Sequence, residues 1–333
     1  MWIAGADWLL FPLLEHWQVT GDEEFLAEVL APWLVEAAMF FEDFLTREDE
    51  HGCMVFVPSY SPEVGPAGRT GVAAVNATMD IAAARHALGA AVEVCTRLGL
   101  EEAAVARWQT LLKQLPPYRV DSRGALAEWA WPGLETPDHH RHVSHLYPVW
   151  PLHEITPDGT PELAAAARRA LVLRGDENLS AHGSLHRALC AARLKDAGLV
   201  EENLGKILGN DMVFRSLMTS HNPGLETYNA DAAHAIPAVI LESLVYSRPG
   251  VIELLPAVPR GWVRGRISGV RCRNRVTVAE LAWNLDRGQA HAVLRSDVDV
   301  VVRVRCERAR GSAGPGEPVP VGAGEPVRVE FEL

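Results

Sequence analysis

Three short stretches of the sequence combine residue types that could carry out acid–base chemistry on a small polar substrate. The first is the loop at 57–66, in which prolines and hydroxyl groups surround one carboxylate, Glu63. Prolines stiffen the backbone, and a general acid must be held within hydrogen-bond reach of the oxygen that it protonates. Glu63 is therefore a candidate general acid. The alternative is a loop glutamate that caps the following turn or is simply solvated.

The second stretch, 139–145, contains four of the thirteen histidines. Glu128-Trp129-Ala130-Trp131 precedes it and Tyr147 follows it, so hydrogen-bond donors and aromatic faces occur together. That combination is typical of a pocket for a polyhydroxylated ligand. One alternative is a metal site within His140–His145, although no H-E-x-x-H spacing accompanies it. Histidines that cap and pack a buried loop are the other alternative.

The third stretch, 219–231, is a polar loop that runs directly into an apolar helix pattern and ends at Asp231. An aspartate at a helix start can serve as an N-cap, which contributes about 1 kcal/mol. The functional interpretation pairs Asp231 with Glu63 across a glycosidic bond. One carboxyl would donate a proton and the other would help to activate water.

The elements that must position these residues fall into two parts with different compositions. Before about residue 247, Ala- and Leu-rich periodic patterns predict helices. After Pro249, Val/Arg alternation with Gly-containing turn signals, among them Gly311 to Gly316, predicts antiparallel strands. We therefore expect a helical domain over 1–247 and a β-sandwich domain over 248–333. The predicted helices cover 22–44, 77–98, 101–115, 160–173, 182–196, 199–208 and 231–246.

Repeated helical hairpins followed by a small β-sandwich favour a mainly α fold, an (α/α) toroid or another helical array. About seven or eight helices are fewer than the twelve of a six-hairpin barrel. We therefore expect a toroid that is incomplete at its N-terminus. Apolar faces left uncovered by missing helices would favour self-association through the incomplete barrel.

The charge balance of the chain indicates which classes of ligand it is suited to bind. The chain carries 31 basic and 43 acidic residues, a net charge of −12. An acidic surface disfavours nucleic acid and anionic membranes and suits neutral substrates such as sugars. The sequence has neither a long apolar span nor a signal peptide, so as written it is expected in the cytoplasm, while a longer parent could be secreted. Five widely spaced cysteines without a C-x-x-C predict reduced thiols.

Taken together, the chemical stretches resemble the catalytic domain of glycoside hydrolase family 95, the inverting α-L-fucosidases and their relatives. The two most specific motifs are Pro-Ser-x-Ser-Pro-Glu at 58–63 and His-Arg-His-x-Ser-His-Leu at 140–146. The remaining blocks follow in the same order along most of the chain: 1–2, 5–9, 15–17, 20–26, Arg174-Gly175-Asp176, Asn229-Ala230-Asp231 and 254–259.

The resemblance implies an (α/α)₆ barrel followed by a C-terminal β domain, with no metal or organic cofactor. By it, Glu63 falls on the family's general acid, and Asp231 on the aspartate that polarises the water-activating group. Arg141 and His142 fall on residues that hold the sugar hydroxyls. The substrate-binding residues that we predict are Arg141, His142, His145, Asn229 and Trp129.

Two departures from the family pattern affect the expected function. Family members begin with a large β-sandwich domain and a linker, and an Asn-x-Asn segment upstream positions the attacking water, whereas Met1 aligns inside the barrel. Asp231-Ala232-Ala233-His234-Ala235 and Ala181-His182-Gly183-Ser184 replace the usual loop sequences. We expect inverting hydrolysis of terminal α-L-fucosyl or related α-L-galactosyl residues. The alternatives are a truncated, non-catalytic carbohydrate-binding remnant and a metal-dependent enzyme that uses the His140–His145 cluster.

Overall fold

The computed structural model of the chain describes residues 2–175, 179–224, 227–310 and 316–333. It divides into two compact units. Unit 1 comprises 1–17, 22–155 and 160–177, and unit 2 comprises 18–21, 156–159 and 178–333.

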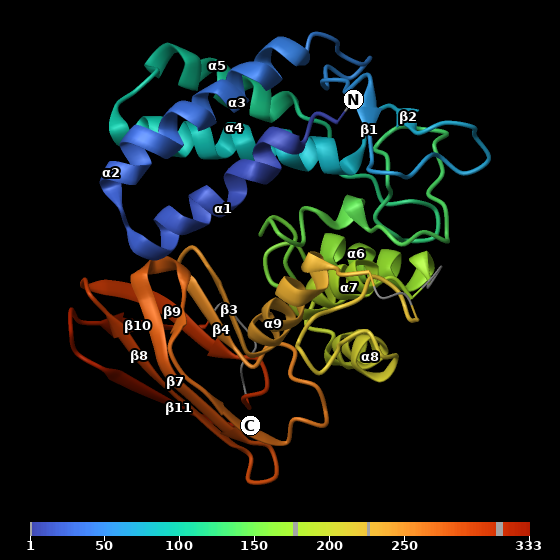
Figure 1. Cartoon of the computed structure of the whole chain (residues 1–333). Helices are drawn as coiled ribbons and strands as arrows, with labels where there is room; N and C mark the ends of the chain where they lie inside the picture. The colour runs from blue at the N-terminus through green and yellow to red at the C-terminus, as the bar shows by residue number, and fades with distance from the viewer. Residues whose placement is uncertain (1, 176–178, 225–226, 311–315) are drawn as a thin grey trace. The chain divides into compact units, whose positions relative to one another are not determined.

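Unit 1 is built of helices joined by long loops, and Figure 1 shows α3, α4 and α5 side by side. A two-stranded hairpin, β1 (Ser59–Tyr60) paired with β2 (Ala73–Ala74), interrupts the helices. The helices are α1 (Gly5–Thr20, most of it in this unit), α2 (Glu23–Phe25), a π-helical segment (Leu26–Leu30), α3 (Ala31–Phe44), α4 (Thr78–Leu98), α5 (Glu102–Gln114) and α6 (Pro161–Arg174).

Helix α4 is the centre of the core of unit 1. Its residues 78–84 are all buried, which is the pattern of a helix covered on every side. Alanines predominate on α4, and their small side chains let α3 and α5 approach closely. The helix ends at Gly99, whose φ of +67° is the left-handed conformation that glycine adopts without strain.

In its described residues, unit 2 combines three α-helices with a two-layer β-sandwich. The helices are α7 (Ala181–Arg193), α8 (Ala197–Gly209) and α9 (Ala230–Leu244), and α7 packs against both of the others. One sheet has the order β10-β9-β4-β3, and the other has the order β11-β8-β7-β5 with β6 also paired to β7. The strands are β3 (Val245–Arg248), β4 (Val251–Leu254), β5 (Arg264–Ile267), β6 (Val270–Arg271), β7 (Val276–Asn284), β8 (Gln289–Ser296), β9 (Val300–Cys306), β10 (Glu317–Val321) and β11 (Val327–Glu332).

The sandwich core arises from alternating burial along the strands. In β8, Ala290, Ala292 and Leu294 are buried while their neighbours are more exposed, as expected of a sheet with one covered face. Gly265 lies directly under the ring of Trp283, where an added Cβ would come within 2.4 Å of ring carbons, so the close packing requires a glycine.

The structure confirms the predicted fold class, mainly α with a C-terminal β domain. One strand pair corrects the expectation of a purely antiparallel sandwich, because β4 and β9 pair in parallel. The chain leaves the first sheet after β4, forms β5 to β8 in the second sheet and returns at β9 in the same direction. The predicted turn at 311–316 lies outside the described residues except for Gly316.

The predicted helices agree with the observed ones to within a few residues, and α1 is an additional helix that the pattern did not indicate. Helix α9 runs into β3 without a loop, so the expected domain boundary at 247 lies within β3. The division into compact units instead falls at 177–178, because α7 to α9 belong to the same unit as the sandwich. The two-domain division at 247 stays a prediction.

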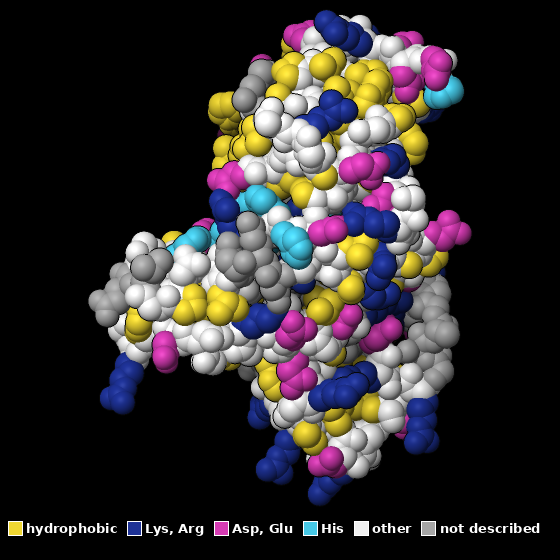
Figure 2. All heavy atoms as spheres, turned by 90° about the vertical axis from the view of Figure 1, so that its right-hand side faces the viewer, with side chains coloured by type: hydrophobic (Ala, Val, Ile, Leu, Met, Phe, Trp, Pro, Cys, Tyr) yellow, Lys and Arg dark blue, Asp and Glu magenta, His cyan; other side chains and the backbone are white. Residues whose placement is uncertain are grey.

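Several large apolar side chains of α1 and α3 are exposed, including Leu9 at 64% and Trp33 at 61%. Figure 2 shows hydrophobic side chains gathered in the upper part of the view, with charged side chains among them. Exposed apolar surface of this kind is suited to association. The predicted self-association stays a prediction. Among the described helices, none combines the length and apolarity that a membrane crossing requires.

Candidate active site

Glu63 stands on a tight turn at the end of β1. The amide of Val64 donates to the carbonyl of Ser61 (3.0 Å), with Pro62 and Glu63 as the two central residues. Because proline fixes a negative φ and Glu63 has a φ of +58°, the turn is of type II. A left-handed conformation costs a residue with a side chain about 1–2 kcal/mol. Strain of this kind is typical of functional positions.

The carboxylate of Glu63 is held by the two residues that the His-Arg-His motif supplies. Oε2 contacts the guanidinium of Arg141 and lies 3.0 Å from Nε2 of His142. The side chain of Glu63 is 53% exposed, so the carboxylate remains accessible from solvent. The structure therefore brings together three of the residues that we predicted for the site.

These neighbours set the ionisation of the cluster. Desolvation by itself would raise the pKa of Glu63, but the hydrogen bond from His142 and the charge of Arg141 outweigh it and hold that pKa below its usual value. Burial lowers the pKa of His142, and the hydrogen bond to Glu63 only partly offsets this. Without a ligand, Glu63 is thus an ionised carboxylate at neutral pH.

Two buried carboxylates lie behind the turn, and sequence reasoning did not identify either as a site residue. Asp80 on α4 accepts hydrogen bonds from the Ser59 hydroxyl (2.6 Å) and the Tyr60 amide (3.0 Å). Glu128 accepts one from the Ser61 hydroxyl. Burial raises the pKa of Asp80 to about 7, against the effect of its two hydrogen bonds. The alternation of serines in the Pro-Ser-x-Ser-Pro motif is the signal that could have indicated such partners.

Glu128 also belongs to a buried ion network. Its Oε2 contacts Arg174 at the end of α6 and lies 2.9 Å from Nδ1 of His145. All three side chains are at most 1% exposed. Desolvation would raise the pKa of Glu128, but His145 and Arg174 together lower it well below its usual value. The carboxylate is therefore ionised and compensated within the interior.

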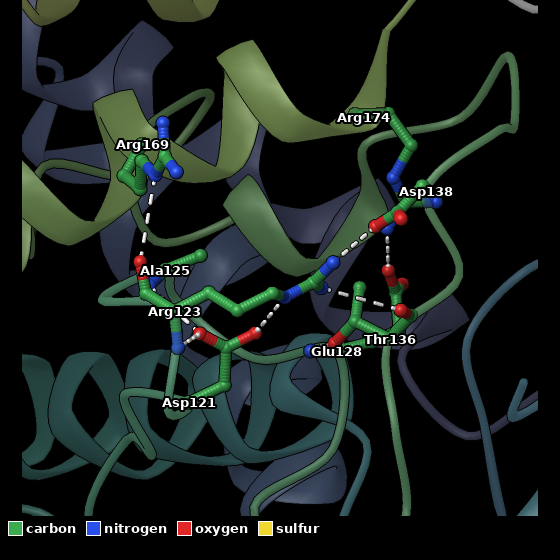
Figure 3. A network of polar contacts seen from close by, with 8 residues as sticks. All are labelled: Asp121, Arg123, Ala125, Glu128, Thr136, Asp138, Arg169 and Arg174. Carbon is green, nitrogen blue, oxygen red and sulfur yellow. Dashed lines mark hydrogen bonds and ion pairs between the residues drawn. The ribbon is translucent and has the colours of Figure 1, made fainter.

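Figure 3 shows how the loop that supplies Glu128 is fixed on both sides. Arg123 pairs with Asp121 (3.2 Å) and with Asp138, and Arg174 reaches Glu128 from α6. The hydroxyl of Thr136 accepts a hydrogen bond from the amide of Glu128 at 2.9 Å. Several charged hydrogen bonds therefore hold this loop in one conformation.

Trp129 and His145, both predicted to bind substrate, are almost completely buried in unit 1. Trp129 packs with Val64 and Leu134 behind the Glu63 turn, and His145 faces Glu128. Both therefore lie behind the exposed cluster of Glu63. Their predicted contact with substrate stays a prediction.

Asp231 belongs to unit 2 and lies in the first turn of α9. The N-cap of this helix is Asn229, whose Oδ1 accepts from the amide of Ala232 at 2.8 Å. The alternative role of Asp231 as the N-cap was therefore wrong, because the residue two positions earlier has the extended backbone of a cap. The carboxylate of Asp231 is exposed and 3.4 Å from the amide nitrogen of Asn229.

Asn229 connects Asp231 to a histidine. Its amide nitrogen lies 3.2 Å from Nδ1 of His221, and the ring of His221 stacks on that of His182 at 5.3 Å. Asn229 caps α9 and makes these contacts, and only 8% of its surface is exposed. Its predicted role in substrate binding, and the pairing of Asp231 with Glu63 across a glycosidic bond, stay predictions.

Within the residues that the structure describes, no group of three or more His, Cys, Asp and Glu side chains could hold a metal ion. His142 and His145 instead face two different carboxylates, Glu63 and Glu128. In the described part of the chain all five cysteines are free thiols.

The buried network makes a prediction about stability. Arg174→Met leaves the Glu128 carboxylate in the interior with one cationic partner removed, and we expect a loss of about 3–5 kcal/mol in the free energy of unfolding. The double variant Glu128→Leu/Arg174→Met should lose less than that single variant. Denaturant titration followed by circular dichroism measures the free energy of unfolding of both variants.

The control is Lys206→Met, which removes an i,i+4 ion pair with the exposed Glu202. It should change the free energy of unfolding by less than about 0.5 kcal/mol. An equally small effect of Arg174→Met would contradict the network's role.

Comparison with known proteins shows the family of the chain. Residues 1–244 match the model of the glycosyl hydrolase family 95 catalytic domain, and residues 246–332 match that of the glycoside hydrolase family 95 C-terminal domain. The chain therefore belongs to glycoside hydrolase family 95.

Among curated proteins, the chain is 31% identical over 301 residues to "Alpha-L-fucosidase 2" of Arabidopsis thaliana. This match covers 85% of the chain and 34% of the relative, so the chain spans about a third of that protein's length. A solved structure, "Putative kojibiose phosphorylase from human microbiome", matches 98% of the chain and 46% of its own, with a TM-score of 0.60 and 10% identity. At that identity the likeness concerns the fold alone, and it agrees with the predicted helical toroid with a C-terminal β domain.

Proposed function

We propose that this chain provides catalytic machinery of a glycoside hydrolase that removes terminal α-L-fucosyl residues, or related α-L-galactosyl residues, with inversion. Glu63 is the general acid and Asp231 assists activation of water. The observation that carries the proposal is the accessible carboxylate of Glu63, fixed on a strained turn and flanked by two hydrogen-bond donors, Arg141 and His142. Membership of family 95 and the fucosidase named among its relatives support the sugar class.

The ionised state of Glu63 in the free protein has a chemical consequence. A general acid must be protonated when the substrate reacts. Hydroxyl groups of a bound sugar would compete for the donors of Arg141 and His142, and the sugar ring would exclude water. Both changes raise the pKa of a carboxyl group. Substrate binding therefore converts Glu63 into an acid at the moment when the acid is needed.

The reaction then proceeds by direct displacement. Glu63 gives its proton to the glycosidic oxygen as the bond from that oxygen to the anomeric carbon breaks. Water attacks the anomeric carbon from the opposite face and loses a proton toward Asp231. Proton gain and loss balance, because one carboxyl group is deprotonated while the other accepts a proton.

The proposal is tested by incubating the protein with aryl α-L-fucosides, α-L-galactosides and β-L-fucosides and measuring the sugar released. We expect turnover of one or both α-L-configured substrates and none of the β-linked ones. The 5-substituent of the preferred sugar distinguishes fucoside from galactoside. Binding of fucose without release from any α-L-configured substrate would overturn the hydrolase and favour a carbohydrate-binding role.

A further inference from the structure

The turn that carries Glu63 is tied to the interior of unit 1 on both sides of Tyr60. The hydroxyl of Ser59 donates to Oδ2 of Asp80 (2.6 Å) and accepts from the amide of Ala77 (2.8 Å). The amide of Tyr60 donates to the same Asp80 oxygen at 3.0 Å. Ser59 is 2% exposed and Asp80 is fully buried, so water does not compete with these bonds.

A second buried carboxylate holds the other side of the turn. The hydroxyl of Ser61 donates to Oε1 of Glu128, while the other oxygen, Oε2, faces Arg174 and His145. Ser61 and Glu128 are both completely buried. The Arg174 guanidinium and the His145 ring fix the Glu128 side chain, and through it the position of Ser61.

The residue between the two serines supports Glu63 directly. Successive side chains of an extended segment alternate in direction, so Ser59 and Ser61 share one face and Tyr60 lies on the other. From there the hydroxyl of Tyr60 accepts a hydrogen bond from the amide of Glu63 at 2.7 Å. Three consecutive side chains thus hold the strained backbone at Glu63. A strained conformation persists only where the surroundings over-determine it.

We propose that Asp80 and Glu128 are positioning residues. Through the hydroxyls of Ser59 and Ser61 they fix the position and orientation of the Glu63 carboxyl. The inference rests on the proposed function of Glu63 as the general acid. Asp80 and Glu128 are both fully buried and accept hydrogen bonds from the serines of the turn, so we assign them no contact with substrate. Their effect on turnover passes through the backbone of the turn.

The consequence for catalysis is specific. An acid must lie about 2.6–3.2 Å from the oxygen that it protonates, and a displacement near 1 Å can cost about 10²-fold in rate. A good leaving group departs without protonation, so its departure does not depend on the position of Glu63. Loss of the hydrogen bond from Ser59 or Ser61 should therefore lower kcat selectively on substrates with poor leaving groups. A general structural defect would lower kcat on all substrates alike.

The experiment compares Ser59→Ala and Ser61→Ala with the parent on two α-L-fucosides. We expect kcat on a fucosyl-galactoside, a poor leaving group, to fall about 10- to 100-fold, and kcat on 2,4-dinitrophenyl α-L-fucoside to stay within about two-fold. Equal losses on both substrates, or no loss on either, would overturn the proposal. Removing the Ser61 hydroxyl leaves the Arg174–Glu128 pair intact, so that variant avoids an uncompensated Glu128 charge.

A matched control is Ser243→Ala on α9. Ser243 is also completely buried, and its hydroxyl donates to the carbonyl of Val239 in its own helix. It should change the two activities equally. If Ser61→Ala does not fold, the same comparison is made with Ser59→Ala alone. That variant should fold because the Tyr60 amide still donates to Asp80.

A second readout does not depend on turnover. Titration of the Glu63 carboxyl by carbon NMR, assigned with Glu63→Gln, should give a pKa below the usual value in the parent and nearer the usual value in Ser61→Ala, because the loosened turn draws the carboxylate away from Arg141 and His142. An unchanged pKa in Ser61→Ala would contradict positioning. If the parent hydrolyses neither fucoside while the pKa still moves, the proposed function fails and the positioning of Glu63 stands.

Discussion

Glu63→Gln should lower kcat about 10²- to 10⁴-fold on substrates with poor leaving groups, which is the usual contribution of a positioned general acid. The amide cannot donate a proton to the glycosidic oxygen. It has nearly the same shape and can still accept hydrogen bonds from Arg141 and His142, so binding of fucose should change little.

Two comparisons make this result specific. Activity on 2,4-dinitrophenyl α-L-fucoside should be largely retained by Glu63→Gln, because that leaving group needs no proton. Glu50→Gln, which neutralises an exposed loop glutamate, should leave kcat unchanged on both substrates. Steady-state kinetics of the parent and of both variants on the two substrates give the six kcat values that are compared. Equal turnover by Glu63→Gln and the parent on the poor leaving group would reject Glu63 as the acid.

Asp231→Asn should lower kcat about 10²-fold or more on every α-L-fucoside, whatever its leaving group, because activation of water is needed in each case. This uniform loss differs from the leaving-group-dependent loss that we expect of Glu63→Gln. The carboxylate is exposed and does not serve as the cap of α9, so its replacement should leave the helix in place.

The matched control for Asp231 is Glu162→Gln. Glu162 is an exposed acid in the first turn of α6, where it has the same favourable interaction with a helix N-terminus. Both substitutions should lower the free energy of unfolding by about 0.3–1 kcal/mol, but only Asp231→Asn should slow turnover. An unchanged kcat for Asp231→Asn would leave that residue with a role in helix stability alone.

The helices and the Glu63 cluster could be predicted from sequence because each depends on a local signal. Periodic Ala and Leu residues identify α4 and α7, and two specific motifs identify Glu63, Arg141 and His142. The motifs lie about 80 residues apart, and the contact of Glu63 with Arg141 and His142 came from the structure and was not predicted from the sequence. Helix α1 gave no such signal, since its apolar residues are not confined to one stripe and Pro12 lies inside it.

The features that sequence could not provide depend on burial and on long-range pairing. The serines of the Pro-Ser-x-Ser-Pro motif could have indicated that buried partners exist. Sequence alone does not show which acidic residues are buried, so it did not single out Asp80 and Glu128. Asn229 and Asp231 are both good N-caps, and only the extended backbone at Asn229 decides between them. The parallel pairing of β4 and β9 likewise depends on where the chain returns after forming the second sheet.

The most direct test of the central claim is proton NMR of the sugar released from an α-L-fucoside during the first minutes of reaction. Water that attacks opposite the departing oxygen, with Glu63 protonating that oxygen, produces β-L-fucose first, and the α anomer then appears by mutarotation. We predict that order. Initial release of α-L-fucose would demonstrate retention and contradict the assigned roles of Glu63 and Asp231.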